Sequence, residues 1–315
     1  MNKIVLVLLL CLGLLHAEKN YTDTVNLLAQ KIKSPAHQHY AWNRLANISD
    51  TYGPRMWGST VLEQVIQEMM NQANHEKFEK VRLEAVSNFT KWVRGKESLT
   101  MLSPRPNPTK LDVIGLGGSV SGDVQADVVV VENYDQLDQL GEKVKGKIVL
   151  YNNKWVDYMT SVTYRVEGPS KAAKYGAKAT LVRSVASESI SSVHTGYMEY
   201  DEKVAKIPCA AITVEDAEMF GRMQKRGQKI TVHLILENQF VNNSRSNNLV
   251  FEIKGSTFPD QIVLAGGHID SWDTGSQTGA NDDGGGFITV FEAFRLLLKN
   301  NLRPKRTLRF VAWSG

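Results

Sequence analysis

A short, glycine-rich stretch of the sequence, 266–286, contains one histidine and four aspartates, and the histidine and three of these aspartates are candidates for a site. His268 and Asp270 directly follow the apolar run 262–265, which is typical of a strand, and Asp282 and Asp283 close the loop that comes next. In open α/β sheets, ligands bind just beyond the carboxyl ends of the strands. A neutral imidazole together with carboxylate oxygens suits Zn²⁺ better than Cu⁺ or Ca²⁺. The stretch therefore predicts a hydrolytic metal site at a sheet edge, with His268 and Asp282 as ligands.

These four residues are not expected to share one role. Asp270 lies two positions after His268, so on a strand both side chains point to the same face, and Asp270 is expected to orient the imidazole rather than bind the metal. Asp282 and Asp283 precede an apolar helical pattern, where an acidic side chain can instead cap the helix or interact with its positive end. This structural alternative stays open, and it suits Asp283 better than Asp282.

The elements around this stretch predict an α/β domain. Helical spacing of apolar residues occurs in 21–46 and in 60–72, and a strand–helix–strand succession occupies 262–265, 287–299 and 307–313. Such a succession is typical of parallel strands joined by a right-handed crossover. We therefore expect a mostly parallel twisted sheet flanked by helices.

A second module interrupts this domain. Short β-branched segments with few helices follow one another between residues 111 and 236, a pattern typical of a compact β-rich domain; the expected strands are 128–131, 147–151, 179–182, 208–213 and 230–236. The predicted organisation is a leader at 1–17, the first part of the α/β domain at 18–110, the inserted domain at 111–244, and the part with the metal site at 245–315.

The N-terminus has the composition of a secretory signal peptide. Lys3 precedes the apolar run 4–15, which is shorter than the about 20 residues that a membrane span needs, and Ala17 offers a small residue for cleavage. No later segment is long and apolar enough to span a bilayer, so the mature chain is expected to be secreted or to reside in the lumen of the secretory pathway or the lysosome. Sequons support glycosylation at Asn20, Asn47, Asn88 and Asn242.

The charge and cysteine content argue against a nucleic-acid-binding protein and against a disulfide-stabilised one. The net charge is only +4, and the lysines and arginines are scattered rather than interleaved with aromatic residues, so no nucleic-acid partner is expected. Cleavage of the leader would remove Cys11 and leave Cys209 alone, so no intrachain disulfide is expected. The apolar surroundings of Cys209 indicate a packing residue rather than a nucleophile.

The metal stretch resembles the signature of the co-catalytic zinc exopeptidases, especially those of carboxypeptidase type. The resemblance rests on 267–272 and 279–285, and on 51–55 with 58–59, which is similar to the family's entry to its first helix. Residues 111–236 resemble the protease-associated domain that such enzymes carry, with its usual landmarks at 146–150, 176–177 and 207–208. The similarity covers nearly the whole chain after the leader.

The resemblance implies a metallo-exopeptidase that hydrolyses terminal peptide bonds of small peptides. In that family a pair of zinc ions activates a water molecule. His268 would bind one zinc, Asp282 would bridge both, and Asp270 would steer the imidazole. A general-base glutamate and further ligands follow the strand that here ends at Gly315, so the 315-residue chain is expected to be inactive on peptides. We also expect 307–313 to be an exposed, aggregation-prone sheet edge. The protein is further expected to form a homodimer.

Two other interpretations stay open. One is a single-zinc glutaminyl cyclase of the same fold, although the inserted module argues against it. The other belongs to a different class: a non-catalytic secreted glycoprotein whose peptidase-like fold presents a binding surface. Intact His268, Asp270 and Asp282 count against that alternative, since a binding protein has no physical need for the geometry of a metal site.

Overall fold

The computed structural model describes residues 21–274 and 277–315. The predicted leader at 1–17, with Cys11, and the sequon at Asn20 lie outside these residues. Cys209 is buried in strand β8 (Cys209–Ile212), where burial raises the pKa of its thiol to about 12, as suits a packing residue. None of the described helices is both long enough and apolar enough to cross a membrane.

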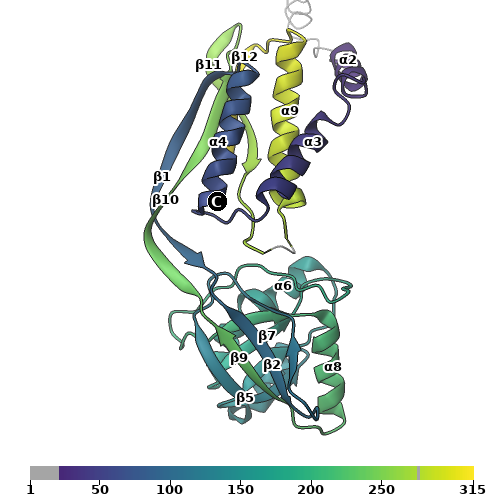
Figure 1. The fold of residues 1–315 in the computed structure, drawn as a ribbon, viewed down its shortest axis with the longest axis vertical. Coiled ribbons are helices and arrows are strands. Elements are labelled where there is room, and N and C mark those ends of the chain that lie inside the picture. Colours follow the sequence, from purple (N-terminus) through teal and green to yellow (C-terminus); the bar gives the residue numbers. More distant parts are fainter. Residues whose placement is uncertain (1–20, 275–276) are drawn as a thin grey trace, which may run out of the picture.

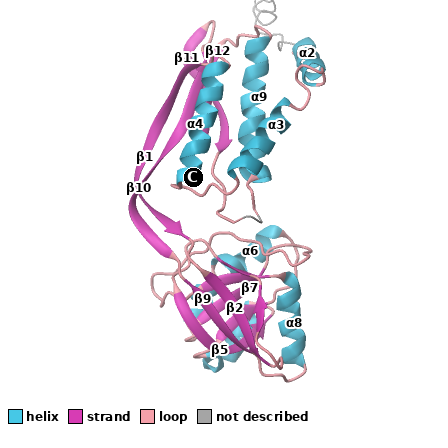
Figure 2. Ribbon diagram, in the orientation of Figure 1, coloured by secondary structure: helices cyan, strands magenta, loops and turns pink. Residues whose placement is uncertain are grey.

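The described residues form two bodies that are stacked along the long axis of the molecule (Figure 1). The first body contains a four-stranded sheet in the order β1-β10-β12-β11, and helices α3, α4 and α9 lie on the same side of it (Figure 2). Its elements are α2 (Thr22–Ile32), α3 (Tyr40–Asn47), η1 (Ile48–Tyr52), α4 (Thr60–His75), β1 (Glu79–Val93), β10 (Gln239–Ile253), β11 (Phe258–His268), η3 (Ala280–Gly284), α9 (Gly285–Lys299) and β12 (Arg306–Trp313).

The strand–helix–strand unit predicted around the metal stretch is present in this sheet. β11 and β12 are parallel, and the connection between them contains α9, whereas β1–β10 and β10–β12 pair antiparallel. The mixed α/β fold is thereby confirmed. The antiparallel share of this sheet is larger than expected, because β1 and β10 form one long ribbon that also carries the chain to the second body and back.

The edge strands of this sheet are β1 and β11, and not β12. The expectation that 307–313 forms an exposed edge is wrong, because β12 pairs with β10 on one side and with β11 on the other. Among the described residues β11 pairs with β12 alone, and its residues Ile262, Val263 and Leu264 are exposed by 46%, 47% and 52%. The apolar edge therefore exists, but it belongs to the neighbouring strand.

Aromatic rings fill the space between this sheet and its helices. Phe251 of β10 stacks against Phe78 and against Phe310 of β12, with ring centroids 4.2 and 4.3 Å apart. Phe291 of α9 meets Phe251 edge-on, with centroids 5.4 Å apart. Because each of these side chains is nearly or fully buried, the cluster anchors α9 to the sheet and so places the start of α9 beside the end of β11.

Helix α4 follows the segment that packs under the metal stretch. It begins after Ser59, whose hydroxyl accepts a hydrogen bond from the backbone N–H of Leu62 at 3.1 Å. Its apolar spacing faces the sheet, as the sequence predicted, and buries Leu62, Val65, Ile66, Met69 and Ala73. The helix thereby holds the chain before Ser59 in a fixed place next to the site.

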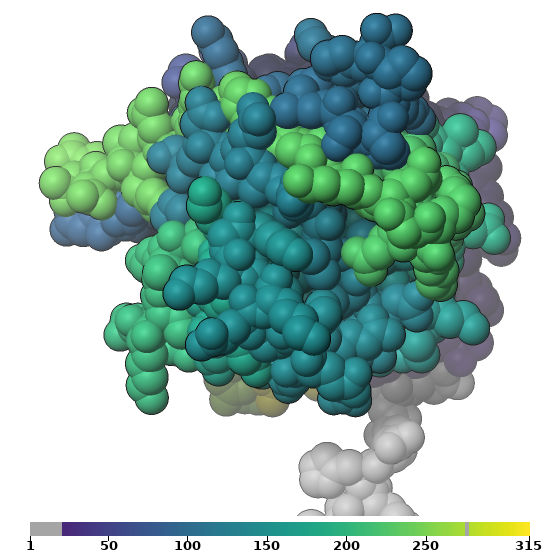
Figure 3. Space-filling view, turned by 90° about the horizontal axis from the view of Figure 1, so that it is seen from below, coloured from purple at the N-terminus to yellow at the C-terminus, as the bar shows by residue number. Residues whose placement is uncertain are grey.

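The second body is built around an eight-stranded sheet in the order β3-β2-β9-β5-β6-β7-β8-β4. Strands β5 to β8 are parallel to one another, and β2 precedes the predicted domain boundary at residue 111 yet pairs within this sheet. Seen from below, this body, coloured blue to green, covers most of the first (Figure 3). Its elements are β2 (Glu97–Ser103), β3 (Thr109–Leu111), β4 (Val113–Gly115), β5 (Gly122–Val131), α5 (Tyr134–Leu140), η2 (Gly141–Val144), β6 (Ile148–Tyr151), α6 (Tyr158–Val166), α7 (Gly168–Ala173), β7 (Ala179–Arg183), β8, α8 (Val214–Lys225) and β9 (Thr231–Leu236).

Candidate metal centre at the end of β11

His268 is the last residue of strand β11 and lies at the carboxyl end of this strand in the first sheet. His268 lies opposite Trp313 of the parallel strand β12, and the backbone N–H of Ile269 still donates to the Trp313 carbonyl at 2.7 Å. The chain leaves the strand at Ile269 and enters η3 at Ala280, and α9 follows. This is the position, beyond the carboxyl ends of parallel strands, at which α/β proteins build their ligand sites.

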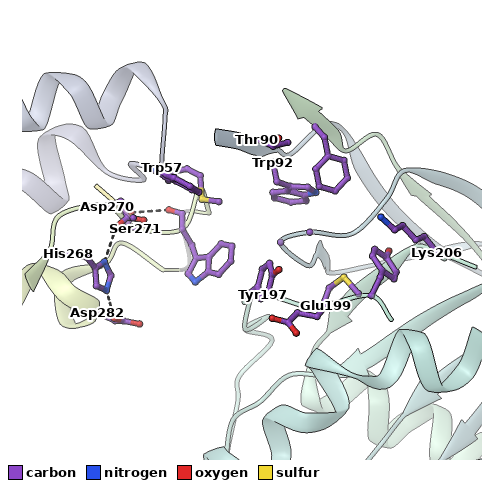
Figure 4. Close-up of a pocket in the computed structure, with 18 of the residues that line it drawn as sticks. Trp57, Thr90, Trp92, Tyr197, Glu199, Lys206, His268, Asp270, Ser271 and Asp282 are labelled. Atoms are coloured by element: carbon purple, nitrogen blue, oxygen red, sulfur yellow. Dashed lines mark hydrogen bonds and ion pairs between the residues drawn. The ribbon is translucent and has the colours of Figure 1, made fainter. Parts of the chain in front are cut away.

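The imidazole of His268 is held between two carboxylates. Its Nδ1 lies 3.0 Å from Oδ1 of Asp270, and its Nε2 lies 2.9 Å from Oδ1 of Asp282 (Figure 4). The Asp270 side chain is 16% exposed, whereas that of Asp282 is 84% exposed. The structure thus brings together the three residues that the sequence singled out, with Asp270 on the inner side of the ring and Asp282 on the open side.

The two carboxylates also change the acidity of the ring. The hydrogen bond to Asp270 is the largest cause of a rise in the pKa of His268 to about 9; partial burial opposes this rise, and Asp282 adds to it. With a pKa of about 9, the ring of the metal-free protein is protonated at neutral pH and donates from Nδ1 to Asp270 and from Nε2 to Asp282. Loss of the Nε2 proton would leave the neutral ring with its proton on Nδ1, where Asp270 accepts it in a hydrogen bond. This is the tautomer that a metal ligand at Nε2 requires.

Asp283 plays a structural part that is separate from Asp282. Its Oδ2 accepts a hydrogen bond from the backbone N–H of His268 at 3.2 Å. A Cβ atom at Gly267 or Gly286 would lie 2.1 or 1.9 Å from a carboxylate oxygen of Asp283, so both glycines make room for this side chain. Helix α9 has no side-chain N-cap bond, which means that neither Asp282 nor Asp283 caps it. Asp283 instead ties the start of α9 to the end of β11.

Arg55 is a residue that pattern analysis did not single out for the site. It is fully buried, and its guanidinium donates to three carbonyl oxygens of the loop, those of Ile269 at 2.6 Å, Thr278 at 2.7 Å and Gly279 at 3.0 Å. Its backbone N–H donates to the hydroxyl of Ser271 at 3.0 Å. Arg55 therefore joins the residue that follows β11 to the residues that precede η3, and so fixes the separation of β11 from η3. Its place in the 51–55 match was the only signal of it in the sequence.

A cavity of about 880 Å³ adjoins the histidine and lies between the two bodies. His268 and Asp282 line it from the first body, and Tyr197 and Glu199 line it from the second (Figure 4). The bodies meet at one side of this cavity, where the indole of Trp272 packs directly on Gly117: a Cβ atom there would lie 2.5 Å from the ring. The site is thus a cleft whose walls come from both parts of the fold.

The donors in the cleft fit part of a zinc site. An imidazole oriented by a carboxylate at Nδ1, with a second carboxylate at Nε2, is a donor set typical of Zn²⁺. Protein zinc sites normally use three or four side chains. Within residues 21–274 and 277–315, no three His, Cys, Asp or Glu side chains are grouped so that they could hold a metal ion. The described chain therefore supplies a pair of donors rather than a complete ligand set.

Comparisons with known proteins point in one direction. The profile of peptidase family M28 matches residues 248–315, which include the whole of the metal stretch. Carboxypeptidase Q of Mus musculus is 44% identical over 299 residues, which make up 94% of this chain and 63% of that protein. Carboxypeptidase Q of Homo sapiens is 46% identical over 281 residues, 88% of this chain and 58% of that protein. The chain thus spans about three-fifths of the length of the curated relatives it matches.

Solved structures agree with these relatives. The crystal structure of a peptidase M28 precursor from Shewanella amazonensis superposes with a TM-score of 0.86 at 31% identity, and the match covers 93% of this chain and 67% of that one. A zinc aminopeptidase from Bacillus subtilis superposes with a TM-score of 0.62 at 19% identity, covering 87% of this chain and 60% of that one. The second likeness is one of fold alone.

Proposed function

Because this chain belongs to peptidase family M28, we propose that its cleft is the metal-binding part of a zinc-dependent exopeptidase of the carboxypeptidase Q type. The substrates would be small peptides, cleaved at a terminal bond. The observation that carries this proposal is the imidazole of His268, oriented by Asp270 on one nitrogen and facing the carboxylate of Asp282 with the other. A ring used only for packing has no need of two carboxylates at that spacing.

Each residue of the trio has a separate role in this proposal. Nε2 of His268 and the carboxylate of Asp282 would hold zinc, with Asp282 shared between the two ions of a complete site. Bound zinc would polarise the peptide carbonyl and acidify a water molecule. Asp270 acts as a positioning residue, since it keeps the proton on Nδ1 and fixes the plane of the ring. Arg55 keeps the loop that carries Asp270 at a constant distance from η3, which carries Asp282.

We expect the polypeptide of residues 1–315, taken alone, not to hydrolyse peptides. Its described residues supply His268 and Asp282 as a pair of ligands, and two protein ligands rarely hold zinc tightly. A longer protein with the remaining ligands and the general base would be active. Peptide hydrolysis by purified 1–315 that is abolished by a chelator and restored by zinc would refute this expectation.

Secretion and glycosylation are further parts of the proposal. Three of the predicted sequon asparagines lie in the described chain, and Asn47, Asn88 and Asn242 are all exposed. Oδ1 of Asn242 accepts a hydrogen bond from Thr90 at 2.8 Å, which leaves the amide nitrogen, the atom that carries a glycan, outside that bond. With the leader at 1–17, these sites predict a secreted or luminal glycoprotein. A shift in mass after glycosidase treatment of protein from the medium of secreting cells tests this.

Direct measurement of zinc binding tests the central proposal. Titration calorimetry of the 315-residue protein should detect weak zinc binding, as suits a site with two ligands, and His268→Ala or Asp282→Asn should abolish it. Asp270→Asn should weaken it by about 10- to 100-fold. His233→Ala is a matched control, because His233 also contacts an aspartate, Asp123, but on the second body. Zinc binding that survives His268→Ala unchanged would contradict the proposal.

A further inference from the structure

Arg165 is a buried arginine of the second body that has no acidic partner among the described residues. It belongs to helix α6, which lies in the part of that body nearest the first (Figure 1), and it is only 6% exposed. Its Nη1 donates to the carbonyl of Thr195 at 3.0 Å, and its Nη2 donates to the hydroxyl of Tyr158 at 3.1 Å. Neither partner carries a charge, whereas a guanidinium stays protonated and a buried charge is normally paired.

Three hydrogen-bond donors around this guanidinium lack a partner. Nε of Arg165 and the hydroxyls of Ser161 and Thr195 are all buried, and none of them makes a hydrogen bond within residues 21–274 and 277–315. Ser161 lies one turn before Arg165 on the buried side of α6, and the carbonyl of Thr195 is bonded to the guanidinium, so the donors belong to neighbouring residues. An unsatisfied buried donor lowers stability, so three of them beside one cation indicate a ligand.

His194 shows that the charge of Arg165 is not offset locally. Its Nδ1 lies 3.4 Å from Nη1 of Arg165. Burial is the largest cause of the lowered pKa of His194, and the positive charge of Arg165 is the second. A water molecule would satisfy the unpartnered donors but would leave this charge unchanged, whereas an anion would satisfy the donors and offset the charge.

We propose that Arg165, Ser161 and Thr195 form a binding site for a small monovalent anion such as chloride. The site offers one positive charge and three N–H or O–H donors, which suits a single negative charge. Because Ser161 and Thr195 are only 3% and 0% exposed, the ligand is a bare ion rather than the carboxylate of a larger molecule. This site is independent of the metal centre, and its test needs neither zinc nor turnover.

The anion site lies directly behind the wall of the cleft. Gly196 packs on the guanidinium, since a Cβ atom there would lie 2.1 Å from Cζ of Arg165. The carbonyl of Gly196 accepts a hydrogen bond from the N–H of Gly117 at 2.8 Å, and the next residue, Tyr197, lines the cleft. An anion held by Arg165 and Thr195 therefore stabilises the segment that forms this wall.

Thermal unfolding of the 315-residue protein in sodium chloride tests the proposal, with sodium gluconate at the same ionic strength as the reference. We expect saturating chloride to raise the unfolding temperature by about 3 °C, because a ligand that binds only the folded state stabilises it. Bromide should act as chloride does, whereas gluconate is too large to enter. A general effect of salt would instead give equal unfolding temperatures in chloride and gluconate.

Variants of the two hydroxyls test the site without removing the arginine. Ser161→Ala/Thr195→Val should abolish most of the chloride shift and change the unfolding temperature in gluconate little, because neither hydroxyl has a partner to lose. Thr163→Val is the matched control on the same helix. Its hydroxyl already donates to the carbonyl of Thr160 at 2.9 Å, so the full chloride shift should remain.

Chlorine-35 NMR measures binding directly. The protein should broaden the signal of free chloride, and this broadening should fall in the double variant but not in Thr163→Val. Equal unfolding temperatures in chloride and gluconate would overturn the proposal and show that water alone satisfies these donors. A full chloride shift in the double variant, or loss of the shift in Thr163→Val, would likewise overturn it, because the ion would then bind elsewhere.

Discussion

Arg94 and Asp273 form a two-pronged ion pair that joins the loop beside His268 to the entrance of the second body. Nε and Nη2 of Arg94 donate to Oδ2 and Oδ1 of Asp273, both at 3.0 Å. Through Nη1 the same guanidinium donates to Glu97 at 2.6 Å and to the carbonyl of Gly115 at 2.7 Å. The side chains of Arg94 and Asp273 are only 14% and 21% exposed, so water screens the pair weakly.

Removing the ion pair between Arg94 and Asp273 should lower the free energy of unfolding measurably. Arg94→Met leaves the shielded carboxylates of Asp273 and Glu97 without their cation, and we expect a loss of about 3 kcal/mol in the free energy of unfolding. Arg94→Lys should recover less than half of that loss, because an ammonium group cannot make the two parallel hydrogen bonds of the fork. Urea unfolding of the two variants measures both values.

A second arginine on the same ribbon provides the control. Arg82 pairs with Glu84 on β1, but these side chains are 36% and 51% exposed. Exposed pairs contribute at most about 1 kcal/mol, so Arg82→Met should be nearly neutral. Equal losses in the Arg94 and Arg82 variants would show that the position of Arg94 has no special effect.

Arg55 should influence zinc binding without touching zinc. Arg55→Met removes three hydrogen bonds to loop carbonyl oxygens, although the oxygen of Gly279 keeps a bond from the backbone N–H of Gly284, so we expect a loss of about 3 kcal/mol in stability at about 1 kcal/mol per lost bond. Arg55→Lys restores part of this network and should remain folded. Its zinc affinity, measured by calorimetry, should nevertheless fall by about tenfold because the loop that carries Asp270 is less fixed. Unchanged zinc affinity in the lysine variant would contradict this role.

Short-range pattern was enough to predict the centre of the site. His268 and Asp270 are two residues apart at the end of an apolar run, and the period of a strand alone puts both on one face. Asp282 follows a glycine-rich loop that leads into a helix, and a chain that returns to the start of that helix passes the end of the same strand. The structure places all three side chains in contact, while their roles toward a metal remain predictions.

Contacts between residues far apart in the sequence could not be predicted from short-range patterns. Arg55 forms hydrogen bonds with residues more than 200 positions away, and Arg94 with Asp273, which is 179 positions away. Short-range sequence patterns cannot predict either set of bonds. The error about the edge strand has a related cause. Chain order gives β11 before β12, but hydrogen bonding places β12 between β10 and β11. The contact of Trp272 with Gly117 was missed for the same reason, since these residues meet only when the two bodies are assembled.

The metal-free protein should show an imidazole that titrates near pH 9. The hydrogen bond to Asp270 first, and then the contact with Asp282, raise the pKa of His268 from 6.5 to about 9 against the effect of partial burial. Because the folded pKa lies above the unfolded value, the charged ring stabilises the fold fully below about pH 6.5, and this contribution is lost as the pH rises through about 9. Zinc requires the neutral ring, so zinc affinity should rise with pH over the same interval. NMR of the His268 ring measures the midpoint directly.

Variants of the two carboxylates should shift this titration unequally. Asp270 is the largest contributor to the raised pKa of His268, and Asp282 contributes less. Asp270→Asn should therefore lower the midpoint more than Asp282→Asn does, while both variants keep the ring in place. A midpoint that stays near pH 9 in Asp270→Asn would mean that the contact at Nδ1 does not control the proton.

The exposed edge of β11 should drive self-association of the 315-residue protein. Ile262, Val263 and Leu264 are about half exposed on a strand that, among the described residues, pairs on one side only, and such an edge can pair with another chain. A lysine at this edge opposes such pairing, so Val263→Lys should reduce dimers and larger species in light scattering at high concentration. Val25→Lys, at a residue of α2 that is 59% exposed, is the control and should have little effect. If both lysines reduce association equally, net charge and not strand pairing governs it, and the expected homodimer would have to form through another surface.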